Sequence, residues 1–243
     1  MEINTFSVIG KDHKVCQDYS ISGLDPFPYI IISDGCSSGI DTDVGSRIIS
    51  NIAKKNIHLL KFNYEKFIET TMIQSKAIAS LMGLKKESLL ATLYIIIKLE
   101  DKLLVLSIGD GDIIYKKDNE IISINFEYEN NIPYYPIYIG KVLDNKNNLI
   151  INKNNNIEIK EFTHINYMEI SLENLDWIIC STDGLHSFTD GSSLYKDLLL
   201  ITDFKQFKGE FVERKMKRFI KTVSKEGFQN DDDWTMGGMS FGE

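Results

Sequence analysis

Short apolar runs separated by polar turns recur along most of the chain, and this alternation predicts many β-strands. The first two predicted strands span residues 3–9 and 28–33, and three more follow at residues 89–99, 102–108 and 112–116. The turns between the last three strands hold only two or three residues. Because a parallel crossover needs about a dozen residues or more, these strands are expected to form an antiparallel meander. Further short strands are predicted at residues 120–124, 136–140, 157–162, 165–170 and 176–181.

Three segments show the apolar spacing of amphipathic helices instead. The first helix is predicted to begin near Asp43, and the second spans residues 64–82, where Gly83 would end it. The third spans roughly residues 209–225. Its basic side, which includes Lys215, either contacts an anionic partner or is simply solvated.

These elements predict an α+β fold, a four-layer α/β/β/α sandwich in which two antiparallel sheets are flanked by helices. The chain shows no linker-like segment or break in composition, so residues 1–243 are expected to form a single domain. The Asn-rich stretch at residues 144–156 is interpreted as an exposed loop or a loose hairpin.

The composition narrows the classes of partner. With 35 acidic and 27 basic side chains, the chain has a formal net charge of −8, which argues against a nucleic-acid partner. It does not argue against a phosphorylated substrate, because bound divalent ions reverse the local field. The longest apolar stretch, residues 89–97, falls short of the roughly 20 residues of a membrane helix. No membrane association and no signal peptide are expected.

Three of the apolar runs end in Asp-Gly, at Asp34, Asp110 and Asp183. A carboxylate at the end of a buried strand is held rigidly, and several such ends that converge would repel one another unless they bind a cation. Carboxylate oxygens of this kind suit Mg²⁺ or Mn²⁺. Asp110-Gly111 also fits a type I′ hairpin turn, which would explain it without any ligand.

Two further acidic places have ordinary explanations when each is taken alone. Asp18 fits a surface aspartate or a cap, and the acidic run at residues 231–233 fits a turn. Together with the Asp-Gly ends, however, they fall into ordered blocks.

Four blocks across nearly the whole chain resemble one family. They read Gly10-x-x-His13-x-x-Cys16-Gln17-Asp18; Ser33-Asp34-Gly35 followed by Asp43-Val44-Gly45; Ala91-Thr92 closing in Ile108-Gly109-Asp110-Gly111; and Cys180-Ser181-Thr182-Asp183-Gly184 with Asp232-Asp233-Trp234-Thr235. Each block alone is weak evidence. Their order and spacing resemble the metal-dependent type 2C serine/threonine protein phosphatases, in a divergent bacterial form.

The resemblance implies a centre that binds two ions of Mn²⁺ or Mg²⁺. Asp34 matches the carboxylate that bridges both ions, and the Gly35 carbonyl matches a ligand of one of them. Asp183 and Asp232 match ligands of the other ion.

Two more acidic residues match supporting roles in this family. Asp18 matches the residue that supports a metal-bound water, and Asp110 matches a residue that helps to hold a weaker third ion. His13 stands where the family commonly has an Arg that grips the substrate phosphate. It is expected to contact the phosphate or the leaving group, with an ordinary surface-loop histidine as the alternative.

The chain also departs from the family pattern. Gln17 replaces a Glu, Cys36 replaces a His proposed as general acid, and Ser187 replaces an Asp, which weakens the case for a third ion. His186, beside Ser187, is interpreted as incidental. The final block reads Asp232-Asp233 in place of Asp-Asn, so either residue could be the ligand.

The three cysteines, Cys16, Cys36 and Cys180, form neither a CxxC pair nor a disulfide pattern, so a reduced, cytoplasmic protein is the simplest interpretation. Each lies near an expected metal ligand. They are interpreted as small buried side chains, with a softer metal or redox inactivation of the site as alternatives.

The expected function is Mn²⁺- or Mg²⁺-dependent hydrolysis of phosphoserine and phosphothreonine in proteins by a metal-activated water, without a phosphoenzyme. The expected partner is a phosphorylated protein, whose choice would depend on the loops at residues 125–136 and 185–200; the oligomeric state stays open. One alternative is a catalytically weak relative that acts as a regulatory or binding module. Another is an enzyme for small phosphoesters or phosphodiesters.

Overall fold

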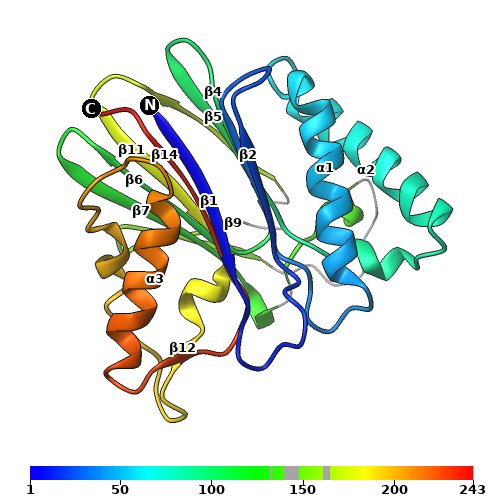
Figure 1. The fold of residues 1–243 in the computed structure, drawn as a ribbon. Helices are drawn as coiled ribbons and strands as arrows, with labels where there is room; N and C mark the ends of the chain where they lie inside the picture. Colours follow the sequence, from blue (N-terminus) through cyan, green and yellow to red (C-terminus); the bar gives the residue numbers. More distant parts are fainter. Residues whose placement is uncertain (132, 140–147, 161–164, 243) are drawn as a thin grey trace.

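The computed structural model describes residues 1–131, 133–139, 148–160 and 165–242. Two antiparallel sheets lie face to face, and helices lie on the outer side of each (Figure 1). The predicted combination of antiparallel sheets and helices is therefore confirmed. No helix in these residue ranges is both long and apolar enough to cross a membrane.

The five-stranded sheet supplies one half of the central core. Its order is β10-β5-β4-β3-β2, with β2 at Tyr19–Gly23, β3 at Tyr29–Ser33, β4 at Leu93–Lys98, β5 at Lys102–Ile108 and β10 at Asn166–Ser171. Every residue of β3 is buried, because the facing sheet covers one side of this strand and α1 covers the other. The strand that leads to Asp34 is thus held firmly in the core.

The seven-stranded sheet brings the two ends of the chain together. Its order is β1-β14-β11-β6-β7-β8-β9, with β1 at Glu2–Val8, β6 at Gly111–Lys117, β7 at Glu120–Tyr128, β8 at Leu149–Lys153, β9 at Asn156–Lys160, β11 at Leu175–Ser181 and β14 at Trp234–Ser240. β1 pairs with β14 along its whole length, from Glu2 opposite Ser240 to Val8 opposite Trp234. The loop after β1 and the acidic run before β14 therefore lie next to each other.

The helices cover the outer faces of the sheets. α1 (Thr42–Leu60) packs on β2 and β3, and α2 (Tyr64–Leu81) packs on α1. The Asn63 side chain accepts a hydrogen bond from the Lys66 amide at 2.8 Å and so caps α2. α3 (Phe211–Ser224) packs on β1 and β14 at the opposite side of the molecule (Figure 1).

Short 3₁₀ helices and one short ribbon complete the fold. The 3₁₀ helices are η1 (Lys86–Leu89), η2 (Glu129–Asn131), η3 (Pro136–Tyr138), η4 (Asp183–His186) and η5 (Leu198–Thr202). The ribbon pairs β12 (Phe188–Thr189) with β13 (Gln229–Asn230). The sequence pattern did not reveal this ribbon or β2.

Several predicted elements are corrected by the structure. The predicted strand at residues 136–140 is wrong, because Pro136 begins the 3₁₀ helix η3; residue 140 lies outside the described residues. The strand predicted to begin at residue 89 begins at Leu93, since Leu89 ends η1 and Ala91 forms only an isolated bridge with Gly35. The strand predicted at residues 157–162 corresponds to β9, and its last two residues also lie outside the described part.

The Asn-rich stretch forms a hairpin where it is described. β8 and β9 pair around Asn154 and Asn155, whose φ angles of 48° and 66° fit a tight two-residue turn. Of the two predicted alternatives, the hairpin is confirmed from residue 149 onward. Residues 144–147 are not among those described.

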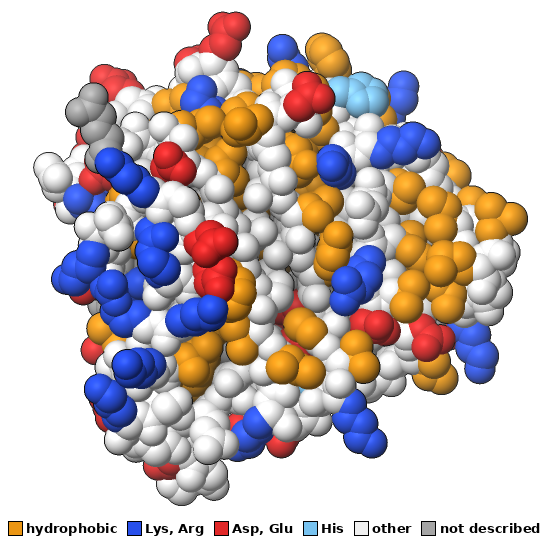
Figure 2. All heavy atoms as spheres, in the orientation of Figure 1, with side chains coloured by type: hydrophobic (Ala, Val, Ile, Leu, Met, Phe, Trp, Pro, Cys, Tyr) orange, Lys and Arg blue, Asp and Glu red, His pale blue; other side chains and the backbone are white. Residues whose placement is uncertain are grey.

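The basic side of α3 faces solvent, and Lys and Arg side chains gather over this helix (Figure 2). Lys215 is an exception to the prediction, because it is only 4% exposed. Its Nζ donates a hydrogen bond to the Asp203 carbonyl at 2.6 Å, and burial lowers its pKa to about 8.

Candidate metal centre

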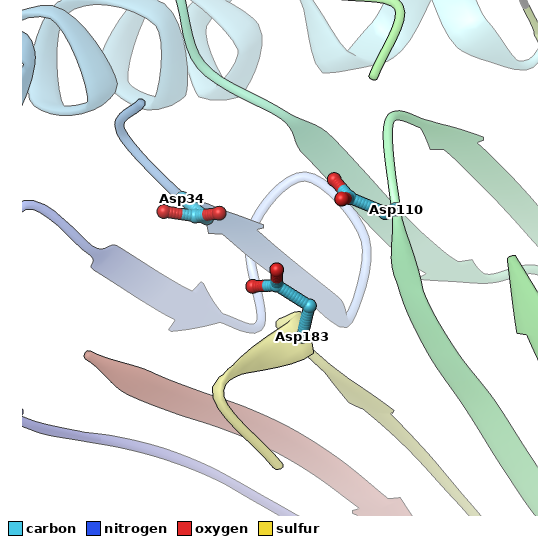
Figure 3. A group of neighbouring side chains, drawn as sticks. All are labelled: Asp34, Asp110 and Asp183. Carbon is cyan, nitrogen blue, oxygen red and sulfur yellow. The ribbon is translucent and has the colours of Figure 1, made fainter. Parts of the chain in front are cut away.

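Three aspartates from distant parts of the chain meet at one edge of the two sheets. Asp34 follows β3, Asp110 lies in the turn between β5 and β6, and Asp183 begins η4 just after β11. One carboxylate oxygen from each lies within 4.8 Å of the others, and the three side chains point toward one another (Figure 3). The three Asp-Gly ends noted in the sequence thus converge on one small volume.

The glycines beside these aspartates allow the close approach. A Cβ at Gly184 would lie 1.9 Å from the Asp233 carbonyl oxygen, and a Cβ at Gly111 would lie 2.5 Å from the Ser181 carbonyl oxygen. Gly111 also has a φ of 136°, which side-chain-bearing residues rarely adopt. Asp110 itself has no positive φ, so the predicted type I′ turn, which requires positive φ at both central residues, does not form here. The predicted antiparallel meander is also wrong at this turn, because β5 and β6 do not pair and belong to different sheets; it holds for β4 and β5.

Asp18 joins the cluster from the loop after β1. It is 2% exposed, and its Oδ2 accepts a hydrogen bond from the Thr182 hydroxyl at 2.9 Å. The charge on Asp18 is one of the causes that raise the pKa of Asp34, so the two carboxyl groups are close neighbours. Asp18 therefore lies directly against the first of the three converging aspartates.

Burial and mutual repulsion make this cluster difficult to ionise. Burial raises the pKa of Asp18 and of Asp183 to about 7 and that of Asp110 to about 6. The pKa of Asp34 lies well above its usual value, first because of burial and then because of the charges on Asp18 and Asp183. Without a cation, the four carboxyl groups cannot all be ionised at neutral pH at low cost.

The cluster fits a hard divalent cation. Among the described residues, Asp18 Oδ1 and Asp110 Oδ1 are buried without a hydrogen-bond partner, a costly state for carboxylate oxygens. All the donor atoms that the cluster offers are oxygens, which suit Mg²⁺ or Mn²⁺ better than softer metals. A bound cation would satisfy both buried oxygens and offset the repulsion.

The two neighbouring aspartates of the final block have different surroundings. Asp233 is 2% exposed, and its oxygens accept hydrogen bonds from the backbone amides of Gly10 at 2.8 Å and Gln17 at 2.5 Å. Asp232 instead lines the cleft that contains Asp34, Asp110 and Asp183. Asp232 is therefore the residue of this pair whose side chain is available to a bound ion.

His13 and Gly35 lie beside the cluster. The Nε2 of His13 lies 3.3 Å from Asp232 Oδ1, and its Nδ1 lies 2.9 Å from Asp233 Oδ2. Burial lowers the pKa of His13, but the two carboxylates outweigh it and raise the pKa overall. Gly35 is buried, and a Cβ there would meet the Thr42 carbonyl oxygen at 2.7 Å. A phosphate contact by His13 and a ligand role for the Gly35 carbonyl stay predictions.

The cleft above the aspartates has a volume of about 530 Å³. Its walls include Cys36, Ser38, Tyr135, His186 and Leu194. The cleft is large enough to admit a phosphorylated side chain together with ions.

The sequence interpretation missed one polar group in this cleft. His186 is not incidental, because its Nε2 lies 2.7 Å from Oδ2 of Asp112, which is 2% exposed. The Nδ2 of Asn125 donates to Asp112 Oδ1 at 3.2 Å. The sequence offers one signal for this pair, a second aspartate two residues after Asp110, at Asp112.

The cysteines have different degrees of access. Burial raises the pKa of the Cys16 and Cys180 thiols to about 12, so neither is a reactive thiolate at neutral pH. Cys36 lines the cleft, and its Sγ lies 3.2 Å from the Ser38 hydroxyl. The interpretation as small buried side chains is correct for Cys180, which is fully buried, but wrong for Cys16 and Cys36, which are only half-buried.

Comparisons with known proteins agree with this architecture. The family model for protein phosphatase 2C matches residues 10–231. No curated protein matches the chain in sequence. The serine/threonine phosphatase Stp1 from Staphylococcus aureus superposes with a TM-score of 0.64 at 12% identity, covering 100% of this chain and 96% of that one.

Two further solved structures have the same fold. The catalytic domain of the serine/threonine protein phosphatase PstP, solved in complex with two manganese ions, superposes with a TM-score of 0.56 at 13% identity, covering 99% of this chain and 98% of that one. The phosphatase domain of SpoIIE from Bacillus subtilis, with a fragment of its regulatory domain, gives a TM-score of 0.62 at 17% identity, covering 99% of this chain and 64% of that one. At these identities the likeness concerns the fold.

Proposed function

The chain belongs to the protein phosphatase 2C family, and on that premise we propose that it hydrolyses phosphoserine and phosphothreonine in proteins with the help of Mn²⁺ or Mg²⁺. The observation that carries this proposal is the convergence of carboxylate oxygens from Asp34, Asp110 and Asp183 within 4.8 Å. The two manganese ions in the PstP complex support a count of two ions per site.

We assign the ligands as follows. Asp34 would be a ligand of both ions, and the Gly35 carbonyl would be a further ligand of one of them. Asp183 and Asp232 would be ligands of the other ion. The side-chain access of Asp232 supports this choice over Asp233. Asp110 lies close enough to Asp34 and Asp183 to bind the same ions or to hold a weaker third one.

Bound divalent ions would lower the pKa of a water molecule and neutralise charge on the phosphoryl oxygens. The protein's own residues would orient the reactants and accept protons. Asp18 accepts a hydrogen bond from the Thr182 hydroxyl and lies next to Asp34, so it is suited to accept a proton from the attacking water. Direct attack by water needs no phosphoenzyme.

The proposal extends to the domain organisation, the partners and the location of the protein. We propose a single phosphatase domain over residues 1–243 with the four-layer α/β/β/α order, which the packing of α1 on β2 and β3 and of α3 on β1 and β14 supports. We also propose phosphoproteins as partners and a cytoplasmic location.

Release of phosphate from a phosphothreonine peptide, measured with added Mn²⁺, tests the function. Activity should disappear when EDTA replaces Mn²⁺ and fall by about 10²-fold or more in Asp34→Asn and Asp183→Asn. The exposed Asp101, in the turn between β4 and β5, provides the control variant Asp101→Asn, which should keep full activity. Folded protein that releases no phosphate with any divalent ion would refute the proposal.

The alternative, an inactive relative that serves as a binding module, makes a different prediction. A collapsed site should bind no Mn²⁺ at millimolar concentration, whereas the proposed enzyme should bind at least one ion in calorimetry. The intact set of buried carboxylates favours the enzyme.

A further inference from the structure

A histidine held by a buried carboxylate forms part of the cleft wall. His186 lies at the end of η4, in the same cleft as Asp34, Asp183 and Asp232. Its side chain is 34% exposed, while the Asp112 side chain beneath it is 3% exposed. The imidazole therefore sits between the cleft and a deeply buried acid.

We propose that His186 is the general acid of the reaction, which donates a proton to the serine or threonine oxygen as that oxygen leaves phosphorus, and that Asp112 and Asn125 position it. This inference rests on the proposed phosphatase function and names the residue that completes its chemistry.

The hydrogen bonds of Asp112 determine which atom of the imidazole can serve. Asp112 Oδ2 lies 2.7 Å from His186 Nε2, and Oδ1 accepts from Asn125 Nδ2 at 3.2 Å. A carboxylate accepts hydrogen bonds, so this contact keeps a proton on Nε2. Among the described residues, Nδ1 of His186 has no hydrogen-bond partner, which leaves this nitrogen for a proton directed at the substrate.

The charges around His186 favour the protonated imidazole that a general acid requires. Three carboxylates face it: Asp112 from β6, Asp183 from η4 and Glu127 from β7. Burial lowers the pKa of His186, but the hydrogen bond with Asp112 and these charges outweigh burial and raise the pKa above the usual value. An ion pair with His186 also compensates the cost of burying Asp112.

The proposed step balances in atoms and charge. The oxygen of a water molecule forms a bond to phosphorus, and the bond from phosphorus to the side-chain oxygen breaks. The electron pair of that bond stays on the side-chain oxygen, which takes the proton from His186 Nδ1 and becomes a neutral hydroxyl. The water keeps one proton on the phosphate product and gives the other to Asp18, which then releases it to solvent. His186 then regains a proton from solvent.

A comparison of leaving groups tests this role. An alkoxide is a strong base and needs a proton to leave, whereas p-nitrophenolate is a weak base and leaves without one. With the full chain and Mn²⁺, His186→Asn should lower kcat/KM for a phosphothreonine peptide by about 10²-fold or more while changing p-nitrophenyl phosphate hydrolysis by less than about threefold. The matched control His58→Asn removes an exposed histidine of α1 and should change neither rate.

A second measurement does not depend on turnover. Nitrogen-15 NMR of the metal-free protein should show the His186 ring carrying a proton on Nε2 throughout its titration. In Asp112→Asn, the pKa of His186 should fall by at least about one unit, because its largest stabilising partner loses its charge.

The outcomes separate the inference from the proposed function. Equal losses on both substrates in His186→Asn, no loss on the peptide, or an unchanged His186 pKa in Asp112→Asn would overturn the general-acid role and leave the phosphatase intact. A wild-type protein that hydrolyses neither substrate would overturn the function itself.

Discussion

Replacing Asp110 by Asn should stabilise the protein when divalent metal is absent. Asp110 lies in the acidic cluster, and its Oδ1 is buried without a partner among the described residues. Burial is the main cause that raises its pKa from 3.8 to about 6. A carboxyl group with a raised folded-state pKa stabilises the fold fully below its unfolded pKa, and this contribution is lost as the pH rises through the folded-state pKa.

The magnitude follows from this shift. About two pKa units correspond to about 3 kcal/mol of lost stability at pH 8, and an Asn at this position carries no charge to be penalised. For a chain of this size, 1 kcal/mol changes the melting temperature by about 2–4 °C, so Asp110→Asn should melt about 6–12 °C above the wild type in EDTA. At pH 4, where the folded wild type holds this carboxyl protonated, the gain should fall below about 1 kcal/mol.

Thermal unfolding in EDTA at pH 8 and pH 4 measures both differences. Added Mn²⁺ at about a hundred times its dissociation constant should stabilise the wild type by about 2.7 kcal/mol and stabilise Asp110→Asn less. The control Asp101→Asn changes an exposed aspartate and should show no such gain. A lower melting temperature for Asp110→Asn than for the wild type at pH 8, or an equal gain at both pH values, would refute the electrostatic reasoning.

Three further predictions concern the surroundings of the cluster. Asp233→Ala should lower the free energy of unfolding, measured in urea, by about 1–3 kcal/mol for each of the two backbone amides that it leaves unpaired. Asp232→Asn should keep the wild-type free energy of unfolding but bind Mn²⁺ about tenfold or more weakly in calorimetry. The reverse pattern would show that Asp233 binds the ion and Asp232 holds the loop. Gly184→Ala should cost about 3 kcal/mol or more and weaken Mn²⁺ binding, because its Cβ would lie 1.9 Å from a backbone oxygen beside Asp183; wild-type stability would contradict this. Trp234→Ala should lower the free energy of unfolding by about 3–5 kcal/mol, since the indole is fully buried and also donates a hydrogen bond to the Ser181 hydroxyl at 2.9 Å. A decrease below about 1 kcal/mol would contradict this and show that neighbouring side chains fill the space.

The core of the site could be predicted because it follows from strand ends. A buried apolar run that stops at Asp-Gly determines both the depth and the rigidity of the carboxylate, as at Asp34 and Asp183. The short turns predicted a meander that holds for β4 and β5 but is wrong for β5 and β6, because these two strands belong to different sheets and Asp110 lies where the chain passes from one sheet to the other. These features are local, and tertiary packing only had to bring the strand ends to one edge.

What escaped prediction depends on orientation and long-range contact. Neighbouring aspartates in a turn point in different directions, so the hydrogen bonds from Gly10 and Gln17 to Asp233, together with the place of Asp232 in the cleft, distinguish the two residues. The pairing of His186 with Asp112 joins positions 74 residues apart. No periodicity in the sequence encodes such a contact, because it depends on how η4 lies across β6.

The paired outer strands of the seven-stranded sheet assemble the site from both ends of the chain. β1 pairs with β14 up to Val8 opposite Trp234, which brings the loop after β1 against the acidic run. Asp233 then fastens this loop through two backbone amides, so that Asp18 enters the cluster from one side and Asp232 from the other. Burying these carboxylates opposes that closure, and a bound cation would favour it. Metal affinity and the pairing of β1 with β14 are therefore coupled, and a change that loosens one should weaken the other.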